Sequence, residues 1–507
     1  MSPAQHKFGP SKVTEFYAQN NVVFLTGTTG FVGKAILEKL LRSCPQITKV
    51  YLLLRISGAK TVQDRVEHEI FSSRIFDTLK AQFASAEDFH DTIVKKIVPV
   101  QGDLTVDLLG LSDKDLVMVR EDVNVIINSA ASVSFDDPLN EAIEMNTKGP
   151  LRIFDVAQGA KNIAACIQVS TCYVNSIMPG GAHVDEKLYT HPIGDPEEIY
   201  DMLSKMSYQE IRQYERSVVL KTYPNTYTFT KSLTEHLIQT RYKAMNLPIV
   251  IVRPSAVTGA HQEPVPGWAE GITAANKAIV SCALGHVQEW IGVETNKVDF
   301  IPVDIVAKVT LLSATVADRT RTESPVYHVG TTCSNPITWT LFGTYVEGYW
   351  NTIQKPRRRI SDDVRFEMFP VAEFKRRFDI RFGEHIRALA WNKDNKNLKD
   401  RISKAMSVPK TFAAFASREW FFDISNTVSL DDAAPLEFKS GMRQGIDWHE
   451  YMQDYNAGVH QFIIREKVDR SLAIEYSQRR VQPTIPILAF QNESVESTHK
   501  PEVIAHL

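Results

Sequence analysis

The chain has 507 residues, of which 43% are hydrophobic and 23% are charged, and its formal net charge is −3. This composition is typical of a globular protein, and the small negative charge argues against nucleic acid as the main partner. The length predicts two domains, or one domain with an elaborated end. The five cysteines are scattered without metal-ligand spacing, so we expect free thiols and no metal site.

A glycine-rich turn lies near the start of the chain. Residues 22–25 are apolar, as in a strand buried on both faces of a parallel sheet, and residues 36–41 show apolar side chains at helical spacing. The turn between them reads TGTTGFVG. Such glycines permit a tight turn, a close approach to a pyrophosphate and close helix packing, while the helix N-terminus offers free N–H donors. The predicted dinucleotide site consists of Thr26, Gly27, Thr29, Gly30, Phe31, Val32 and Gly33.

The next predicted strand, residues 50–54, ends in Arg55. An enzyme that selects NAD usually carries Asp or Glu near this point, where the carboxylate binds the ribose 2′-hydroxyl. No acidic residue occurs between Glu38 and Asp64. A guanidinium at the strand end suits a 2′-phosphate, so Arg55 favours NADPH. The alternative is that Arg55 is a solvated residue at a strand end.

Two further apolar strands end in small or polar residues. They are residues 97–100, followed by Asp103 and Leu104, and residues 123–127, followed by Asn128 and Ala130. Ligands of open α/β sheets bind at the carboxyl edge of the strands. We therefore expect Asp103 to meet the adenine amino group, and Asn128 and Ala130 to lie on the adenosine side. Each of these residues could equally be a turn former.

The candidate catalytic residues come from two segments. An apolar strand ends in Ser170 and Thr171, and the later segment PNTYTFTK, residues 224–231, carries Tyr227 and Lys231 four positions apart on one helix face. The Lys231 ammonium would stabilise the Tyr227 phenolate and lower its pKa from about 10. The same lysine could hold the nicotinamide ribose. A hydroxyl of Thr171 or Ser170 would bind the carbonyl oxygen of the substrate.

These motifs, in this order, resemble the extended short-chain dehydrogenase/reductase superfamily. Several segments are similar to fatty acyl-CoA reductases in particular. They are TGTTGFVG (26–33), PNTYTFTK (224–231), VRPS (252–255), EPVPGW (263–268), DFIPVD (299–304), REWFFD (418–423) and IDWHEY (446–451). The resemblance runs from about residue 20 to about residue 465. Pro254 and Val257 complete the candidate cofactor contacts.

The resemblance implies an α/β fold, with a Rossmann-type doubly wound parallel sheet and a mainly helical C-terminal domain. The expected parts are an N-terminal segment 1–19, a cofactor-binding and catalytic domain 20–345, a C-terminal domain 346–477 and a tail 478–507. The implied reaction is NADPH-dependent reduction of long-chain fatty acyl-CoA to a primary alcohol, via an aldehyde, with release of CoA. Thr171 and Tyr227 would stabilise the oxyanion. The segment 185–221, just before the catalytic helix, could cover the site or shape an acyl tunnel.

The chain departs from many relatives, which carry a hydrophobic C-terminal anchor, because it ends in polar sequence and has no apolar run long enough to span a bilayer. The final Ala505-His506-Leu507 is a permissive variant of a peroxisomal address. It would connect the enzyme with ether-lipid synthesis; the alternatives are the cytosol and the endoplasmic-reticulum surface. Basic runs at 355–359 and 375–377 could meet CoA phosphates or an anionic membrane, or form solvated faces.

Other readings of the same residues remain. Cys172 beside Thr171 suggests a thiol nucleophile, but no histidine recognisably pairs with it, and we interpret both Cys172 and His328 as structural. A sugar-nucleotide epimerase or a hydroxysteroid dehydrogenase would share the glycine turn and the Tyr–Lys pair, and a reductase of carrier-bound thioesters is a further alternative. Intact Thr171, Tyr227 and Lys231 argue against a non-catalytic scaffold. Acyl chain length and oligomeric state stay open.

Overall fold

A seven-stranded parallel sheet forms the centre of the computed structural model, which describes residues 12–468 apart from 57, 273, 354 and 392–395. Its strand order is β12-β7-β5-β4-β1-β2-β3. The strands are β1 (Val22–Thr26), β2 (Lys49–Leu54), β3 (Ile97–Gln101), β4 (Val125–Asn128), β5 (Ala165–Val169), β7 (Ile249–Pro254) and β12 (Val326–Val329). The register places Leu25 between Leu52 and Ile127. The predicted Rossmann-type α/β fold is confirmed.

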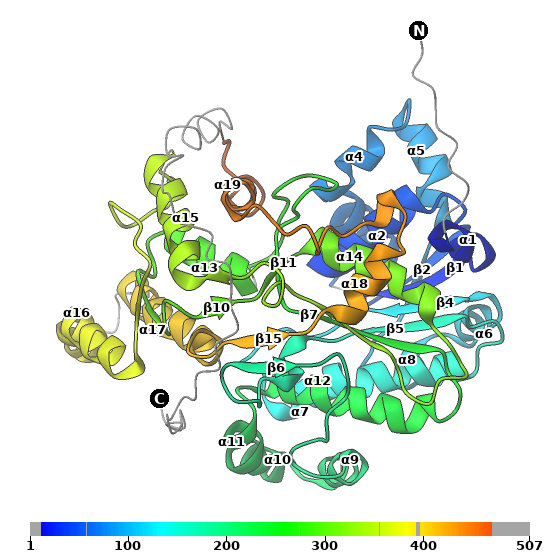
Figure 1. Ribbon diagram of the computed structural model, residues 1–507, viewed down its shortest axis with the longest axis horizontal. Helices are drawn as coiled ribbons and strands as arrows, with labels where there is room; N and C mark the ends of the chain where they lie inside the picture. Colours follow the sequence, from blue (N-terminus) through cyan, green and yellow to red (C-terminus); the bar gives the residue numbers. More distant parts are fainter. Residues whose placement is uncertain (1–11, 57, 273, 354, 392–395, 469–507) are drawn as a thin grey trace.

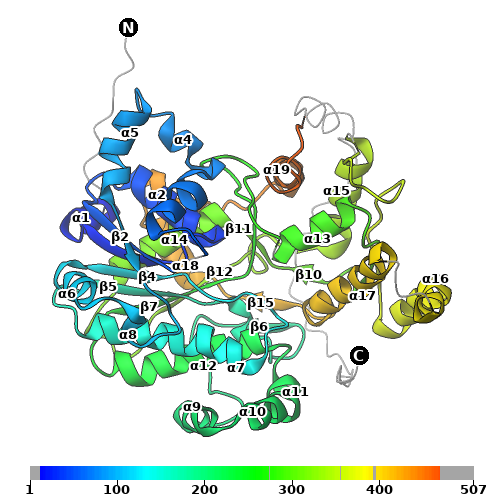
Figure 2. The same cartoon turned by 180° about the vertical axis from the view of Figure 1, so that it is seen from behind.

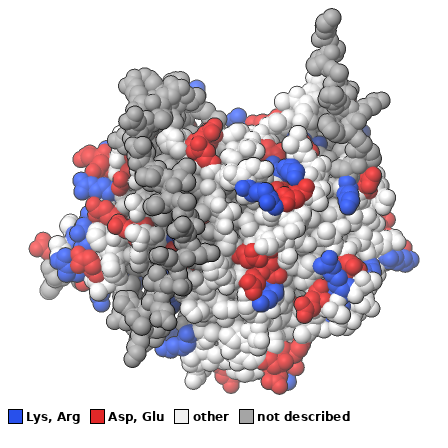
Figure 3. Space-filling model, viewed as in Figure 1, with Lys and Arg blue, Asp and Glu red and all other residues white. Residues whose placement is uncertain are grey.

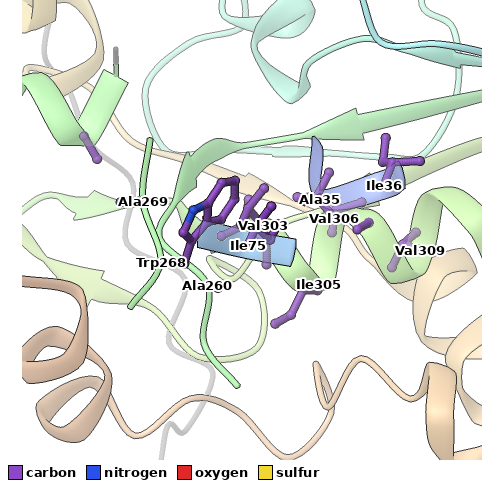
Figure 4. Close-up of a cluster of buried hydrophobic side chains, with 14 of the residues drawn as sticks. Ala35, Ile36, Ile75, Ala260, Trp268, Ala269, Val303, Ile305, Val306 and Val309 are labelled. Carbon is purple, nitrogen blue, oxygen red and sulfur yellow. The ribbon is translucent and has the colours of Figure 1, made fainter. Parts of the chain in front are cut away.

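Both faces of the sheet are buried under helices (Figure 1). One layer contains α2 (Phe31–Ser43) and α14 (Val303–Ser313), and the other contains α8 (Gly149–Gln158) and α12 (Thr226–Leu237). Neighbouring strand residues point to opposite faces, so Leu25 packs with the first layer and Phe24 with the second. Figure 4 shows Ala35 of α2 lying beside Val306 of α14. Because both faces are covered, the strands read as continuous apolar runs.

Helices from the second half of the chain form a lobe at one side of the sheet (Figures 1 and 2). They are α13 (Ala274–Ala283), α15 (Trp339–Thr352), α16 (Val371–Trp391), α17 (Lys396–Ala416) and α19 (Trp448–Gly458). Buried polar contacts join them: Trp350 Nε1 donates to Asn456 Oδ1 at 2.7 Å, and the Tyr455 hydroxyl donates to Asn276 Oδ1 at 2.6 Å. The boundary predicted between residues 345 and 346 lies inside α15, so the two predicted domains share this helix.

After α17 the chain returns to the sheet. β15 (Trp420–Phe422) pairs in parallel with β6 (Ala182–Val184), and α18 (Ser425–Asp432) packs against β12 and α14. Both ribbon views show α17 leading into β15 beside β6 (Figures 1 and 2). Part of the predicted C-terminal domain therefore packs beside β6, β12 and α14.

Smaller elements surround this frame. Three further strand pairs are β8 (Ala256–Thr258) with β11 (Phe300–Pro302), β9 (Glu289–Ile291) with β14 (Glu367–Phe369), and β10 (Lys297–Val298) with β13 (Ile337–Thr338). In the segment 185–221, α9 (Pro196–Lys205) packs on α12, and α10 (Tyr208–Tyr214) packs on α7 (Leu139–Ile143). Among the described helices, none has both the length and the apolar character needed to cross a membrane.

Candidate active site

The glycine-rich turn joins β1 to α2 and is closed by backbone contacts. Gly27 has a φ of +75°, and a Cβ at this position would lie 2.8 Å from the backbone nitrogen of Ala130. A Cβ on Gly33 would lie 2.2 Å from the carbonyl oxygen of Gly27. Both distances are shorter than a van der Waals contact, so only glycine allows the helix and the neighbouring strand end to approach the turn this closely.

The first turn of α2 keeps polar groups available for a phosphate. Gly30 precedes the helix, and no side chain caps it, so the first N–H groups of α2 lack intrahelical partners. Thr28 Oγ1 is buried, and among the described residues it has no hydrogen-bond partner. Thr29, Phe31 and Val32 are half-buried around this point. In the described part of the chain, the helix start has no side-chain cap, the Thr28 hydroxyl is free, and the glycines of the turn have no side chains. These features fit the pyrophosphate of a dinucleotide.

A chain of hydrogen bonds joins the ends of β1, β4 and β5. Thr26 Oγ1 donates to Asn128 Oδ1 at 2.7 Å and accepts from the Ala130 N–H at 3.1 Å. Asn128 Nδ2 donates to Gln168 Oε1 at 2.9 Å. The predicted place of Asn128 and Ala130 on the adenosine side stays a prediction, and the structure adds a structural role for the Asn128 side chain. This side chain is buried and holds strand ends together, because its amide is bonded on both sides.

Arg55 and Asp103 meet at the same sheet edge, where β2 and β3 end. Arg55 Nη1 lies 3.9 Å from Asp103 Oδ2, and 60% of the Arg55 side chain is exposed. Asp103 Oδ1 accepts from the N–H and the hydroxyl of Thr105 at 2.9 and 2.8 Å, so Asp103 also shapes its turn. Leu104 is buried and packs against Gly149. The exposed guanidinium is open to a further anion, whereas Leu104 supports the fold.

The Tyr–Lys pair lies in the first part of α12. Asn225 caps this helix, and its Oδ1 accepts an N–H of the first turn at 2.9 Å. Lys231 is buried, and its Nζ donates to the carbonyl oxygen of Val169, the last residue of β5, at 3.1 Å. Tyr227, one turn before Lys231, is half-buried. This contact fixes the catalytic helix against the end of β5.

Ser170 and Thr171 continue the chain directly from that point. The Ser170 N–H donates to the Val252 carbonyl at 2.7 Å, and its buried Oγ has no partner in the described part of the chain. Thr171 Oγ1 accepts from the Tyr173 N–H at 3.3 Å, which leaves its hydroxyl proton for another acceptor. Two hydroxyl groups are thus placed at the strand end, where each can donate to a carbonyl oxygen.

Burial shifts the pKa values of both Tyr227 and Lys231. It lowers the pKa of Lys231 to about 8, although the nearby Glu235 carboxylate opposes this shift. Burial also raises the pKa of Tyr227 above its usual value. This is the opposite of the lowered phenol pKa that the sequence predicted. The physical reason is that the ammonium points to the Val169 carbonyl and lies 6.0 Å from the centre of the tyrosine ring.

A fully buried ion pair lies next to Lys231: Glu235, one helical turn later in α12, pairs with Arg253. Arg253 and Glu235 are each 1% exposed, with Nη2–Oε2 and Nε–Oε1 distances of 2.6 and 3.0 Å. Arg253 Nη1 also donates to His328 Nε2 at 3.2 Å, and His328 Nδ1 donates to the Asp423 carbonyl at 2.8 Å. Burial, together with the Arg253 charge, lowers the pKa of His328 to about 3, so this ring is neutral. His328 links the ion pair to the C-terminal segment, a structural role.

Cys172 is unsuited to be a nucleophile. Its buried thiol donates to the Arg253 carbonyl at 2.8 Å. Burial raises the pKa of this thiol well above its usual value. Because the thiolate is the reactive form of cysteine, a protonated thiol in this position serves packing rather than catalysis.

Sequence reasoning missed a group of aromatic side chains beside Tyr227. The Phe135 ring lies 5.8 Å from the Tyr227 ring, and the Phe415 ring lies 5.3 Å from Phe135 and 4.9 Å from Tyr173. Tyr173 could have been suspected from its position next to the Ser-Thr strand end. No local pattern marks Phe135 or Phe415, because they belong to a loop and to a distant helix.

The remaining candidate residues, Pro254 and Val257, lie in short strands, and the EPVPGW segment lies between two helices. Pro254 ends β7, and Val257 lies in β8, where it pairs with β11. In the EPVPGW segment, Glu263 binds Lys39 of α2 at 3.0 Å and Lys308 of α14 at 2.7 Å. The attraction of these lysines lowers the pKa of Glu263 to about 2 against the opposing effect of burial. This segment therefore ties two helices together.

The two basic runs are partly engaged in the fold. Arg359 Nε donates to the Ala283 carbonyl at 2.9 Å, and Arg377 pairs with Glu289 at 2.9 Å. Figure 3 shows basic and acidic side chains interspersed on the face it presents. Only part of each run is therefore available to an anion.

Comparisons with known proteins agree with this arrangement. Residues 25–310 match an NAD-binding family described as "Male sterility protein". Fatty acyl-CoA reductase 1 of Mus musculus and fatty acyl-CoA reductase 2 of Homo sapiens are each 28% identical over 467 residues, which cover 90% of this chain and 87% of each relative. In fold, the chain is similar to the reductase domain of a nonribosomal peptide synthetase from Mycobacterium tuberculosis, with 16% identity and a TM-score of 0.56 over 90% of this chain and 94% of that domain.

The family match covers more than half of the chain and includes the glycine turn, the Ser-Thr strand end and the Tyr–Lys helix. The chain therefore belongs to the male sterility protein family, together with its fatty acyl-CoA reductase relatives, and is an oxidoreductase with the extended short-chain dehydrogenase/reductase fold.

Proposed function

We propose that this enzyme reduces long-chain fatty acyl-CoA to the primary fatty alcohol, through an aldehyde, with NADPH as reductant and CoA as leaving group. The observation that carries the proposal is the meeting of the Tyr227–Lys231 helix with Ser170 and Thr171 at the end of β5. The glycine turn lies on the same edge of the sheet, one strand beyond β4. Relatives named fatty acyl-CoA reductase, similar over 90% of the chain, support a fatty acyl thioester as substrate.

The side chains of this site bind the reacting carbonyl and supply a proton. The hydroxyls of Thr171 and Tyr227 donate to the carbonyl oxygen, so the negative charge that develops there is stabilised. Because burial raises its pKa, Tyr227 carries its proton at neutral pH and can donate it to the alkoxide that becomes the alcohol. Lys231, with a pKa of about 8, is mostly an ammonium at pH 7, and the Val169 carbonyl holds it at the end of β5.

The chain fits NADPH at three positions. The turn at residues 26–33 would hold the pyrophosphate, Arg55 the 2′-phosphate and Lys231 the nicotinamide ribose. When bound, NADPH supplies a hydride to the thioester carbon and, in a second round, a hydride to the aldehyde carbon. The balance is two NADPH and two protons per acyl-CoA, which yield one alcohol, one free CoA and two NADP⁺.

The test is a stoichiometric assay of purified full-length protein with stearoyl-CoA, in which NADPH consumption, free CoA and extracted lipid are measured together. We expect two NADPH per CoA, recovery of octadecanol, and loss of both signals in Tyr227→Phe. One NADPH per CoA with accumulation of aldehyde would overturn the alcohol-forming step. No release of CoA from any acyl-CoA would overturn the substrate class and favour a dehydrogenase or epimerase.

Cofactor choice is tested separately through Arg55. Its guanidinium is exposed and lies beside the weakly paired Asp103. Replacement in Arg55→Gln removes a charged donor, and such hydrogen bonds contribute about 1.5–3 kcal/mol, so the preference for NADPH over NADH should fall about tenfold or more. An unchanged ratio of kcat/KM for the two cofactors would remove Arg55 from the NADPH site.

We also propose that the enzyme is peroxisomal, where its alcohol would serve ether-lipid synthesis. The proposal is based on Ala505-His506-Leu507, which lie outside the described residues. A fluorescent protein at the N-terminus should colocalise with peroxisomes, and deletion of Leu507 should release it. A tagged protein that lies outside peroxisomes both with and without Leu507 would overturn the proposal and favour the cytosol or the endoplasmic-reticulum surface, whose anionic lipids the basic runs could contact peripherally.

A further inference from the structure

Aromatic side chains form a continuous row that starts at the catalytic tyrosine. We use "aromatic row" for Phe135, Tyr173 and Phe415. The Phe135 ring contacts Tyr227 at 5.8 Å, Phe415 contacts Phe135 at 5.3 Å, and Tyr173 contacts Phe415 edge-on at 4.9 Å. The three members come from the loop after β4, from the turn directly after Thr171 and from the last turn of α17. The row therefore joins the catalytic residues to the C-terminal half of the chain.

The position of Phe415 is fixed by the elements that follow it. α17 ends at Ala416, and the chain enters β15, which is paired with β6 (Figures 1 and 2). Trp420 Nε1 donates to the Met178 carbonyl at 3.0 Å. Tyr173 packs edge-on against the Phe422 ring at 5.6 Å. The last turn of α17 is thus anchored beside the strand end that carries Thr171.

The loop that carries Phe135 is anchored by hydrogen bonds at both ends. Asn146 holds its start through two 2.9 Å hydrogen bonds with the backbone of Ser132, and Thr226 Oγ1 donates to the Asp137 carbonyl at 2.8 Å. Between these anchors, Val133 is 53% exposed. Phe135 and Phe415 are only half-buried. Large apolar groups are thus held partly exposed next to the catalytic hydroxyls, where burial under an apolar ligand would be favourable.

The chemistry of the row matches an aliphatic chain. Its rings contribute no charge, and desolvation raises the pKa of the Tyr173 hydroxyl well above its usual value, so this hydroxyl stays neutral. An aliphatic chain needs no hydrogen-bond partner and gains free energy in proportion to the apolar area that it buries. In the segment 185–221, α9 packs on α12 and α10 on α7, and its expected role as a cover or tunnel wall stays a prediction.

We propose that Phe415 is a specificity-determining residue for the acyl group, with the aromatic row as the surface along which the acyl chain lies while Thr171 and Tyr227 hold the carbonyl. This inference rests on the proposed reduction of fatty acyl-CoA. Phe135 contacts Tyr227 and Phe415 lies beyond it, so Phe415 meets methylene groups farther from the carbonyl. An octanoyl chain ends near Phe415, whereas a stearoyl chain extends past it, so the shorter chain buries less apolar area against this ring.

The test compares kcat and KM for octanoyl-CoA and stearoyl-CoA in the full-length enzyme. Phe415→Ala should lower kcat/KM for stearoyl-CoA about tenfold, mainly through KM, and that for octanoyl-CoA about twofold or less. Phe412→Ala is the matched control, because Phe412 is a half-buried residue of the same helix whose ring faces Trp290 at 6.0 Å. This control should change both substrates by the same factor.

A second variant, Phe415→Leu, keeps an apolar side chain. It tests the role of Phe415 in acyl-chain specificity if Phe415→Ala does not fold and shows no thermal unfolding transition. We expect it to shift the stearoyl-to-octanoyl ratio in the same direction, by a smaller factor. Wild-type ratios in both variants, with normal stearoyl-CoA turnover by the wild type, would overturn the inference and leave the proposed function intact. A wild-type enzyme that reduces neither substrate would overturn both.

Discussion

The two halves of the carboxyl edge of the sheet are built differently. Over β1, β2 and β3, the cofactor half is shaped by the glycine turn, in which Gly33 packs on the carbonyl oxygen of Gly27, and by the contact of this turn with the end of β4. Over β5, β7 and β12, the catalytic half depends on contacts between distant segments. Thr427 Oγ1 donates to Glu186 Oε1 at 2.9 Å across 241 positions of the chain. The geometry of the cofactor half thus depends mainly on the local backbone of the turn, whereas that of the catalytic half depends on long-range packing and on the burial of charge.

The difference also concerns how charge is handled. In the cofactor half, Arg55 is exposed and weakly paired, which suits a residue that receives a ligand. In the catalytic half, Arg253 and Glu235 are removed from water and neutralise each other. Buried pairs tolerate the loss of one partner poorly, because the other charge remains without solvent or counter-ion. The four predictions that follow probe this contrast.

The largest effect is expected at Tyr227. Tyr227→Phe removes the proton donor but keeps the ring that packs on Phe135, so kcat for stearoyl-CoA reduction should fall roughly 10²–10⁴-fold. The free energy of unfolding should change little. Steady-state kinetics and urea denaturation give the two values. A variant that keeps more than a tenth of the activity would show that the proton comes from another group.

Breaking the buried ion pair should be the largest change in stability. Arg253→Met leaves Glu235 uncompensated at 1% exposure, and such losses cost about 3–5 kcal/mol of unfolding free energy. The control is Arg376→Met, which breaks an exposed pair with Glu373 and should cost about 1 kcal/mol or less. Equal losses in both variants, measured by urea denaturation, would contradict the proposed contrast between the halves.

The glycine turn should respond to a single methyl group. Gly33→Ala places a Cβ 2.2 Å from the Gly27 carbonyl oxygen, whereas Gly30→Ala places one at 3.2 Å from the same atom. Overpacking of this kind costs about 1–3 kcal/mol, so Gly33→Ala should be destabilised by that amount and Gly30→Ala by less. NADPH binding, followed by its fluorescence, should weaken in the same order. The reverse order in both measurements would mean that the turn relaxes freely.

The smallest effect concerns pH. The pKa of Lys231 is about 8, so its ammonium is present below this value and is lost as the pH rises through it. If the ammonium is needed, kcat should fall to about half at pH 8 and further above it. Tyr227, whose pKa burial raises, does not titrate in this window. A flat profile of kcat between pH 7 and 9.5 would exclude a charge-dependent role for Lys231.

Local patterns predicted the elements that carry the glycine turn and the Tyr–Lys pair. The alternation of apolar strand, glycine turn and helix at residues 22–41 corresponds to β1 and α2. The four-residue spacing of Tyr227 and Lys231 corresponds to the start of α12. Such features could be predicted because their geometry repeats over a few residues of continuous chain.

Two properties of the site could not be read from local patterns. The Asn128 side chain is bonded to Thr26 and Gln168 on neighbouring strands. Tyr227 was expected to have a lowered pKa, which burial instead raises. Both properties depend on what surrounds a side chain from other parts of the chain, and a motif does not contain that information.

The sequence by itself determined the Rossmann-type sheet and the glycine turn and singled out the candidate catalytic residues, because strand and helix periodicity and turn chemistry are local properties. Only the tertiary structure decided that Phe415 lies in a row with Phe135 and Tyr173 beside the catalytic tyrosine. It also decided that Arg253 of β7 is paired with Glu235, one helical turn after Lys231. Packing and desolvation act through space, so residues far apart in the chain acquire their roles only when the fold brings them together.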